Sequence, residues 1–287
     1  MSLENAAKNN RYLFQVLILL VNFYDIILNS THKNLFCVLF NVKSLIRGWM
    51  VRFTYDYSSG LYEAIERNKK IFFKHTRIAN GSYSGGFASR AKSIGSAYML
   101  SLIKFNDGDL IIDCGANVGD LHLYFESQSI DVRLIAFEPS PVEYNCLIKN
   151  VNSSKCFVYN YGLWNIGSVL KFYVSSRGAD SSLIEPAEYD EVVEVSTKRL
   201  DGLNINGPIK LLKIEAEGCE PEVLEGASGI LHAVEYISAD LGFERGINKT
   251  STLVPVCNYL ITRGFVIEDI NFARLCVLFR NTNFNLI

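Results

Sequence analysis

The sequence predicts an α/β fold, in which a mostly parallel sheet is covered by helices on both faces and ends in an antiparallel hairpin. Two patterns carry this prediction. From residue 108 onward, short apolar runs alternate with segments of helical periodicity, an alternation typical of parallel sheets. The last two apolar runs, 265–270 and 275–280, stand too close together for an intervening helix, so we expect them to pair as a hairpin.

The elements of the alternating region follow from these runs and from the residues that end them. Pro139 cannot continue a strand, Pro221 suits the first turn of a helix, and Gly264 suits a helix end. Strands are expected over 109–113, 132–137, 156–161, 209–214 and 234–241, and helices over 121–125, 141–150, 221–231 and 252–263.

The section from 167 to 197 breaks the alternation. Its two apolar runs, 168–174 and 192–196, have no helical segment between them. We interpret them as an added hairpin or sheet edge. The polar loop Asp180-Ser181-Ser182 beside it is either a contact for a hydroxyl-bearing ligand or a plain turn.

The first 92 residues are expected to form a helical extension, with the main domain over 93–287. The stretches 35–53 and 61–73 show helical spacing, and the glycine–serine cluster 80–86 is interpreted as the hinge to the main domain. The apolar run 12–28 contains Asp25, which disfavours a membrane-spanning helix. Three interpretations of this run stay open: a helix buried against the main domain or a second subunit, an interfacial helix on a membrane, and a weak signal anchor.

Net charge and cysteine usage indicate which partners and which cellular compartment to expect. The formal net charge is −2, and the pI is about 6.1, whereas proteins that hold polyphosphate usually carry a basic excess. We therefore expect no nucleic-acid partner. The seven cysteines are scattered without a C-x-x-C pair, which favours reduced thiols in a cytoplasmic protein, and the four histidines form no metal-ligand cluster.

A polar side chain follows or ends each of four predicted strands. They are Asp113, Glu138, Asn160 and Glu215. Ligands of such folds bind outside the carboxyl ends of the strands, so we expect these side chains to surround one crevice.

The loop after the first of these strands reads Asp113-Cys114-Gly115-Ala116-Asn117-Val118-Gly119. Dinucleotide-binding loops have the pattern G-x-G-x-x-G, and here Asn117 replaces the middle glycine, which would crowd a pyrophosphate. Glu138, about 20 residues further on, stands where a carboxylate accepts the ribose hydroxyls. The pattern therefore indicates an adenosine-type ligand without a diphosphate. The alternative is a tight strand–helix turn next to an exposed glutamate.

Four motifs in order resemble the FkbM family of methyltransferases over about residues 97–243. They are Asp113-x-Gly115-Ala116-Asn117-x-Gly119, Phe137-Glu138-Pro139, Gly162-Leu163-Trp164-Asn165 and Leu212-Lys213-Ile214-Glu215-x-Glu217-Gly218-x-Glu220. The resemblance implies a class I methyltransferase (Rossmann-like) fold with a seven-stranded sheet, S-adenosylmethionine as cofactor, and O-methylation of a sugar or related hydroxyl. One departure is Glu215, where the family usually has aspartate.

On this resemblance we assign two groups of site residues. The cofactor-binding group is Asp113, Gly115, Asn117, Gly119, Glu138, Pro139, Asn160 and Gly162. The catalytic group is Glu215, Lys213 and Glu217, any of which could remove the hydroxyl proton, a role worth about 10²–10⁴-fold in rate. Alternatively, Glu217 and Glu220 only favour the N-terminus of the following helix. His122 is expected to be structural.

Two other functions stay open at this point. One is an NAD-dependent oxidoreductase on a similar fold, which the missing glycine disfavours. The other is a non-catalytic methyltransferase-like module docked at a membrane through the N-terminal helices. The expected partners are a small-molecule or glycan acceptor and a second copy of the chain in a homo-oligomer.

Overall fold

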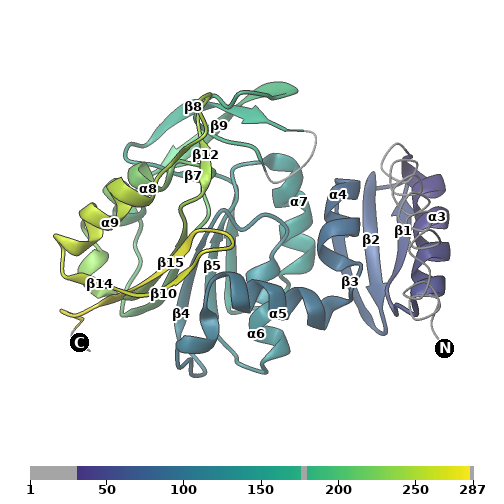
Figure 1. The fold of residues 1–287 in the computed structure, drawn as a ribbon, viewed down its shortest axis with the longest axis horizontal. Coiled ribbons are helices and arrows are strands. Elements are labelled where there is room, and N and C mark those ends of the chain that lie inside the picture. The colour runs from purple at the N-terminus through teal and green to yellow at the C-terminus, as the bar shows by residue number, and fades with distance from the viewer. Residues whose placement is uncertain (1–30, 176–179, 285–287) are drawn as a thin grey trace, which may run out of the picture.

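The computed structural model describes residues 31–175 and 180–284 (Figure 1). The apolar run 12–28 lies outside these residues. Within them, no helix combines the length and apolarity needed to cross a membrane.

The main sheet has seven strands in the order β14-β15-β11-β10-β4-β5-β6. The four pairings among β11, β10, β4, β5 and β6 are parallel, whereas β15 pairs antiparallel with both β11 and β14. The predicted sheet and terminal hairpin are thereby confirmed. The bounds are β4 Leu110–Cys114, β5 Arg133–Phe137, β6 Cys156–Tyr159, β10 Ile209–Ile214, β11 Val234–Asp240, β14 Phe265–Asn271 and β15 Cys276–Asn281.

Helices cover both faces of this sheet. Along β4, Leu110 and Ile112 pack in the core that includes Val223 and Leu260, while Ile111 packs in the core on the other face. Burial on both faces explains why the strands are apolar runs without polar alternation. The bounds are α5 Phe87–Ala97, α6 Asp120–Ser127, α7 Pro141–Asn150, α8 Glu220–Gly226 and α9 Leu253–Ile261, with short 3₁₀ turns at Leu100–Leu102, Leu200–Gly202 and Leu231–Ala233.

Two small sheets lie beside the carboxyl ends of the main strands (Figure 1). The first contains β7 (Gly162–Leu163), β8 (Ser168–Val174) and β9 (Glu191–Lys198), in the order β7-β9-β8. It confirms the added hairpin. The second pairs β12 (Phe243–Arg245) with β13 (Thr250–Ser251).

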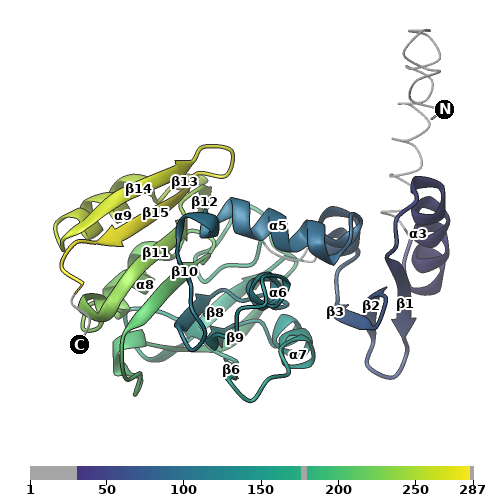
Figure 2. The same cartoon turned by 90° about the horizontal axis from the view of Figure 1, so that it is seen from below.

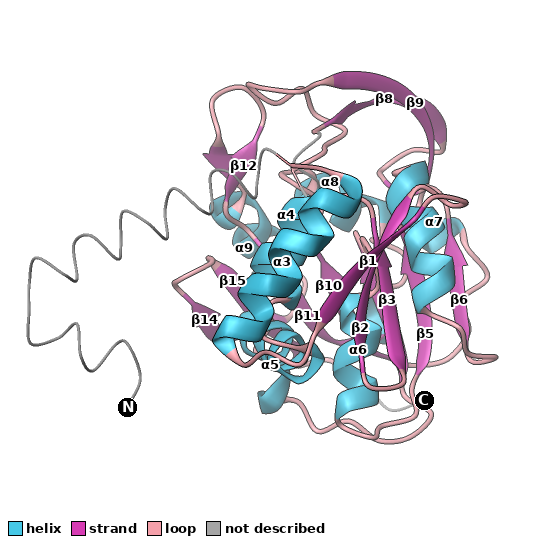
Figure 3. Cartoon of the chain, turned by 90° about the vertical axis from the view of Figure 1, so that its right-hand side faces the viewer, coloured by secondary structure: helices cyan, strands magenta, loops and turns pink. Residues whose placement is uncertain are grey.

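The N-terminal region is only partly helical. Helix α3 (Lys33–Arg47) ends at Gly48, whose φ of +70° suits glycine, and it lies across an antiparallel sheet of three strands (Figure 3). These are β1 (Arg52–Asp56), β2 (Leu61–Glu66) and β3 (Lys69–Phe73), followed by α4 (Thr76–Ile78) and a π-helical turn over Ala79–Tyr83.

The helix predicted over 61–73 is therefore wrong. Tyr62 and Ala64 are buried, as are Ile71 and Phe73, so each segment buries every second residue, as a strand does. Arg67, with φ of +55°, makes the turn between the two strands. The helix predicted over 35–53 is correct only as far as Arg47. Helix α5 runs through the expected boundary at 92/93, and the division into two domains stays a prediction.

The N-terminal sheet is fastened to the main domain at the free edge of β3. The side-chain amide of Asn150 donates to the carbonyl oxygen of Phe72 at 2.8 Å and accepts from its backbone N–H at 2.7 Å. The same amide nitrogen donates to the carbonyl of Val118 in the glycine loop at 2.8 Å. His75, just after β3, lies 3.1 Å from Glu143 on α7. Figure 2 shows this sheet standing apart from the strands of the main sheet.

Helix α3 is apolar on two opposite sides. Phe36 and Phe40 pack in the core against the three strands. On the outward side, five large apolar side chains are exposed: Leu35, Val38, Val42, Leu45 and Ile46.

Candidate functional site

A cavity of about 420 Å³ lies outside the carboxyl ends of β4, β5 and β10. Strand order reverses between β4 and β10, so this is the topological switch point at which such sheets bind ligands. All three predicted catalytic residues line the cavity, and so do six of the predicted cofactor-binding residues: Asp113, Gly115, Asn117, Glu138, Pro139 and Gly162.

The glycine loop needs its first glycine for contact with the protein's own backbone. Gly115 has φ of +73°, and a Cβ there would lie 1.8 Å from the carbonyl oxygen of Glu215 at the end of β10. The N–H groups of Gly115 and Ala116 both donate to the carbonyl of Phe137 at 3.0 Å. The loop is therefore fixed to the ends of both neighbouring strands.

Glu138 is hydrogen-bonded to this loop. Its Oε2 accepts from the N–H of Asn117 at 2.8 Å, and its Oε1 accepts from the N–H of Ser140 at 2.9 Å. Each oxygen keeps a second lone pair, which suits the two ribose hydroxyls of an adenosine. Burial, with help from nearby Glu143, raises the pKa of Glu138 to about 8. The buried Oδ1 of Asn117 has no hydrogen-bond partner among the described residues, so it can accept from the amino group of a ligand.

Gly119 and Asn160 do not line the cavity. A Cβ on Gly119 would lie 2.7 Å from Val151, so this glycine allows close packing of α6. The amide of Asn160 donates to the carbonyls of Glu138 and Pro139 at 2.9 and 3.0 Å, which supports the loop that carries Glu138. Direct contact of either residue with the cofactor stays a prediction.

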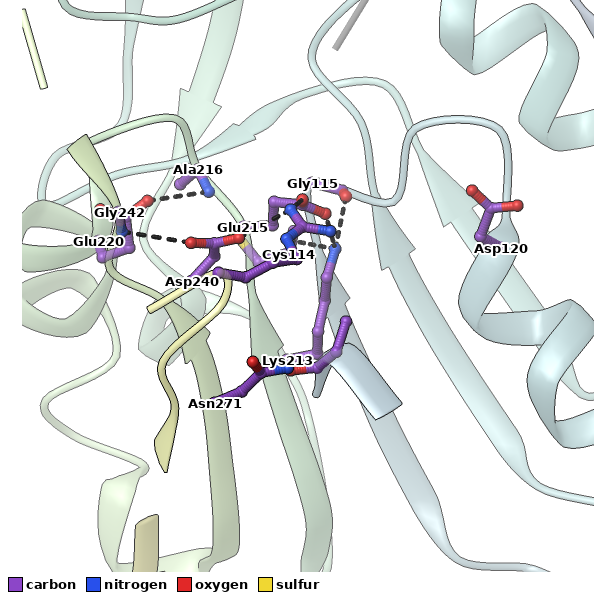
Figure 4. A network of polar contacts seen from close by, with 12 residues as sticks. Cys114, Gly115, Asp120, Lys213, Glu215, Ala216, Glu220, Asp240, Gly242 and Asn271 are labelled. Atoms are coloured by element: carbon purple, nitrogen blue, oxygen red, sulfur yellow. Dashed lines mark hydrogen bonds and ion pairs between the residues drawn. The ribbon is translucent and has the colours of Figure 1, made fainter. Parts of the chain in front are cut away.

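Lys213 extends from β10 toward the glycine loop, with Glu215 and Asp240 beside it (Figure 4). Its Nζ donates to the carbonyl of Gly115 at 2.7 Å and lies 3.0 Å from Asp113 Oδ1 and 3.2 Å from Glu215 Oε2. Burial favours a neutral lysine, but the two carboxylates outweigh it and raise the pKa of Lys213. Lys213 therefore stays charged and acts as an anchor for the loop.

Arg274 is a site residue that sequence reasoning missed. Its Nη2 lies 2.9 Å from Glu215 Oε1 and 2.7 Å from Asp240 Oδ2. Burial alone would raise the pKa of Glu215, yet Lys213 and Arg274 lower it to about 2. So weak a base accepts protons poorly near neutral pH. No local pattern marks Arg274, because it reaches the site only through the turn between β14 and β15.

Two other carboxylates in the cavity have quite different surroundings. Glu217 and Glu244 are half-buried, and neither carboxylate has a hydrogen bond or ion pair with a described residue. Burial and then Glu244 raise the pKa of Glu217 well above its usual value, while burial and other acids raise that of Glu244 to about 8. Glu244, on β12, is another residue that the sequence did not reveal.

The carboxylate of Glu220 is taken up by hydrogen bonds within the protein. Its Oε1 accepts from the N–H groups of Ala216 and Gly218, both at 3.1 Å, and its Oε2 accepts from the hydroxyl of Thr252 at 2.8 Å. These bonds fix the turn that carries Glu217.

The loop Asp180-Ser181-Ser182 lines the cavity. The hydroxyl of Ser182 donates to the carbonyl of Glu217 at 2.8 Å, and Asp180 pairs with Arg77 at 2.6 Å. His122 lies outside the cavity lining, 3.8 Å from Glu126 on its own helix. Within the described ranges, no group of three or more His, Cys, Asp or Glu is placed to hold a metal ion.

Comparison with known proteins gives a family match over about half of the chain. The methyltransferase FkbM domain matches residues 113–253. The methyltransferase sdnD of Sordaria araneosa is 26% identical over 208 residues, covering 53% of this chain and 80% of that protein. Methyltransferase 1 of Beauveria bassiana (strain ARSEF 2860) is 26% identical over 149 residues, covering 42% of this chain and 59% of that protein.

Among solved structures, the chain is similar to Sp1610 of Streptococcus pneumoniae, described as a putative tRNA (m1A22) methyltransferase in complex with S-adenosyl-L-methionine. The TM-score is 0.41 and the identity 14%, over 69% of this chain and 75% of that one. The family match agrees with the motifs around the cavity, and Glu138 and Asn117 there fit an adenosine-bearing amino acid. Residues 113–253 are therefore similar to the methyltransferase FkbM domain, the family that the motifs resemble and for which they predict S-adenosylmethionine as methyl donor.

Proposed function

We propose that this protein transfers a methyl group from S-adenosylmethionine to a hydroxyl oxygen of a sugar, glycan or related small metabolite. The observation that carries the proposal is Glu217, a carboxylate with no partner among the described residues, in the same cavity as the donor-binding residues. A hydroxyl acceptor must lose a proton as the new bond forms, so it needs such a base.

In this proposal each of the following cavity residues has a separate role. Glu138 accepts the ribose hydroxyls, and Asn117 accepts from the amino group of the donor. Lys213 and Glu215 fix the glycine loop against β10, through the contacts described above. The donor supplies a methyl group on a sulfonium, which makes sulfur a good leaving group.

Glu217 completes the reaction on the acceptor side. A lone pair of the acceptor oxygen forms the bond to the methyl carbon, while the carbon–sulfur bond breaks and its electron pair stays on sulfur. The hydroxyl proton passes to Glu217 and then to water. Because Glu215 is held ionised by two cations, Glu217 is the better base of the two.

The test is a transfer assay with isotopically labelled methyl donor and a panel of sugars and glycan fragments. We expect S-adenosylhomocysteine and a product that carries the label as a methyl ether. Label on nitrogen or carbon, or binding of the donor product without transfer to any hydroxyl, would contradict the proposal. In a parallel thermal-shift assay, stabilisation by NAD but not by S-adenosylhomocysteine would favour the oxidoreductase alternative.

We also propose that the N-terminal region contacts a lipid surface. The support is the outward apolar side of α3, the basic residues Lys43 and Arg47 on the same helix, and the apolar run 12–28 that ends just before it. The L45Q/I46Q variant should sediment less with anionic vesicles than the wild type. Equal sedimentation of the two proteins, or loss of a dimer in the variant, would favour a second copy of the chain as the occupant of this face.

A further inference from the structure

A second cavity, of about 380 Å³, adjoins the donor cavity. It lies beside the β8–β9 insertion and β12, and its lining includes Tyr189, Phe243 and Lys249. Four residues line both cavities: Asp180, Ser182, Glu217 and Glu244. A molecule in the second cavity would therefore reach the donor across this shared wall.

We propose that the second cavity binds the acceptor, and that Glu244 is a catalytic residue that shares one proton with Glu217 at the wall between the cavities. This inference rests on the proposed O-methyl transfer. The ionised member of the pair accepts the acceptor's hydroxyl proton as the carbon–oxygen bond forms and the carbon–sulfur bond breaks. The protonated member donates a hydrogen bond to the acceptor, and the surplus proton leaves to water.

The backbone brings the two carboxylates together. A Cβ on Gly218 would lie 2.4 Å from the Cα of Arg245, so the residues that follow Glu217 and Glu244 are in direct contact. The glycine, with φ of +90°, is what permits this approach. The two glutamate side chains thus arise from adjoining segments, although the residues stand far apart in the sequence.

Two neighbouring cations, Arg245 and Arg274, are committed elsewhere, while Lys249 lines the second cavity with the pair. Arg245 donates to Glu222 at 2.8 and 2.6 Å and to the carbonyl of Gly218 at 2.5 Å. Arg274 pairs with Glu215 and Asp240. Two carboxylates near each other without a paired cation cannot both ionise readily, so one proton is shared between them. Burial is the largest cause of the raised pKa of each group, and Glu244 is the largest charged contributor to the raised pKa of Glu217.

Several charged groups face the pair and enter any pH dependence. For Glu217 they are Glu244, Glu215, Asp180 and Glu220. For Glu244 they are Asp240, Glu220, Glu215 and Arg274.

The residues that line the second cavity limit which chemical class of compound can be the acceptor. At the wall shared with the donor cavity, Glu217 and Glu244 have no paired cation among the described residues. Such a wall repels phosphates and carboxylates. The exposed ring of Phe243 and the ring of Tyr189 offer apolar faces to a sugar ring. The acceptor is therefore an uncharged or amine-bearing polyhydroxyl compound.

The first experiment uses the full chain and needs no acceptor. It compares thermal denaturation from pH 5 to 9 for the wild type, E217Q, E244Q and E217Q/E244Q, with E194Q, an exposed glutamate, as control. A raised pKa in the folded state means that the Tm falls as pH rises toward about 8. We expect this fall to be smaller in either single variant, and the two single reductions to add up to more than the reduction in the double variant, because each removes the coupling between the glutamates, while E194Q behaves as the wild type. A wild-type pH profile for E244Q would overturn the shared proton.

The second experiment uses the acceptor found by the transfer assay. E217Q should lose about 10²–10⁴-fold in kcat. E244Q should shift the acidic limb of the kcat/KM profile to lower pH, because the pKa of Glu217 falls when its neighbour becomes neutral. Affinity for S-adenosylhomocysteine should not change in either variant. If the acidic limb of the kcat/KM profile is unchanged in E244Q, this inference is wrong, but the proposed O-methylation still stands. If the wild type transfers no methyl group to a hydroxyl, the proposed function itself is wrong.

The acceptor class is tested with three probes that differ in charge. Glucose, glucosamine and glucose 6-phosphate are titrated into the complex with S-adenosylhomocysteine. We expect the phosphate to bind weakest, and to gain affinity in E217Q/E244Q. Tightest binding of the phosphate to the wild type would overturn the proposed class.

Discussion

The donor half of the crevice and its proposed acceptor half differ in how their carboxylates are partnered. In the donor half, Asp113 is paired with Lys213, and Glu138 accepts two backbone N–H groups. In the acceptor half, Glu217 and Glu244 have no such partners among the described residues. Groups with such partners hold geometry, because hydrogen bonds and ion pairs fix their side chains. Unpaired groups remain available for proton transfer, and here burial and nearby acids raise their pKa values.

The largest difference between the halves should appear in their glycines. In Gly115→Ala, a left-handed φ costs about 1–2 kcal/mol and the clash with Glu215 about 1–3 kcal/mol more, so the free energy of unfolding should fall by about 2–5 kcal/mol. Gly246 lines the second cavity, and a Cβ there would meet nothing closer than 3.5 Å, so Gly246→Ala should cost only the left-handed φ, about 1–2 kcal/mol. Urea denaturation measures both. Equal losses would show that the donor loop is not the more tightly constrained half.

The next largest effect should fall on donor affinity. Glu138→Ala removes the acceptor of the ribose hydroxyls, and each hydrogen bond to a charged group is worth about 1.5–3 kcal/mol. The Kd for S-adenosylhomocysteine should therefore rise at least about tenfold in calorimetry, while E194A binds as the wild type does. An unchanged Kd for Glu138→Ala would show that the ribose lies elsewhere.

The two halves also differ in how far the sequence reveals them. The donor half was predicted because Asp113, the glycine loop and Glu138 follow directly from the ends of adjacent strands. Lys213, Glu215 and Glu217 also lie in the cavity where their strand end predicts them. The acceptor half depends on which distant segments the sheet order brings together. Glu244 and Arg274 arrive there on β12 and on the β14–β15 turn, and no spacing in the chain encodes that.

The remaining errors in the predicted secondary structure have local causes. In the N-terminal region, apolar residues stand at adjacent positions as well as alternate ones over 61–66 and 69–73, so the two runs joined by the turn at Arg67 also fit helical spacing. Helix α5 was not predicted, although its buried Phe87, Ala91 and Ile94 stand at helical spacing and could have revealed it.

The third effect is a pH dependence of donor binding, in which the binding free energy should change by about 1.4 kcal/mol per pH unit. Below its pKa of about 8, Glu138 is protonated in the free protein, whereas two hydroxyl donors require the ionised form. Affinity for S-adenosylhomocysteine should therefore rise about tenfold per unit from pH 6 to about 8 and then level off. Calorimetry in buffers of different ionisation enthalpy should report release of about one proton at pH 7. The same release in Glu138→Gln would assign the proton to another group.

The smallest effect should come from the ion pair between Arg77 and Asp180, which joins the N-terminal region to the acceptor loop. Both side chains are about half exposed, and such pairs are worth about 0–1 kcal/mol. Asp180→Asn should therefore leave the urea midpoint nearly unchanged. A loss of several kcal/mol would show that the acceptor half is held as firmly as the donor half.

Asn150 connects the glycine loop to a strand more than seventy residues away in sequence. One side-chain amide holds the backbone of Phe72 at the edge of β3 and the carbonyl of Val118 beside the donor site. The amide hydrogen of Phe72 can exchange with solvent deuterium only when this link opens. Occupation of the donor site should thus slow hydrogen exchange at Phe72. The N-terminal sheet lies outside the matched residues 113–253, yet it would report from a distance whether the donor site is occupied.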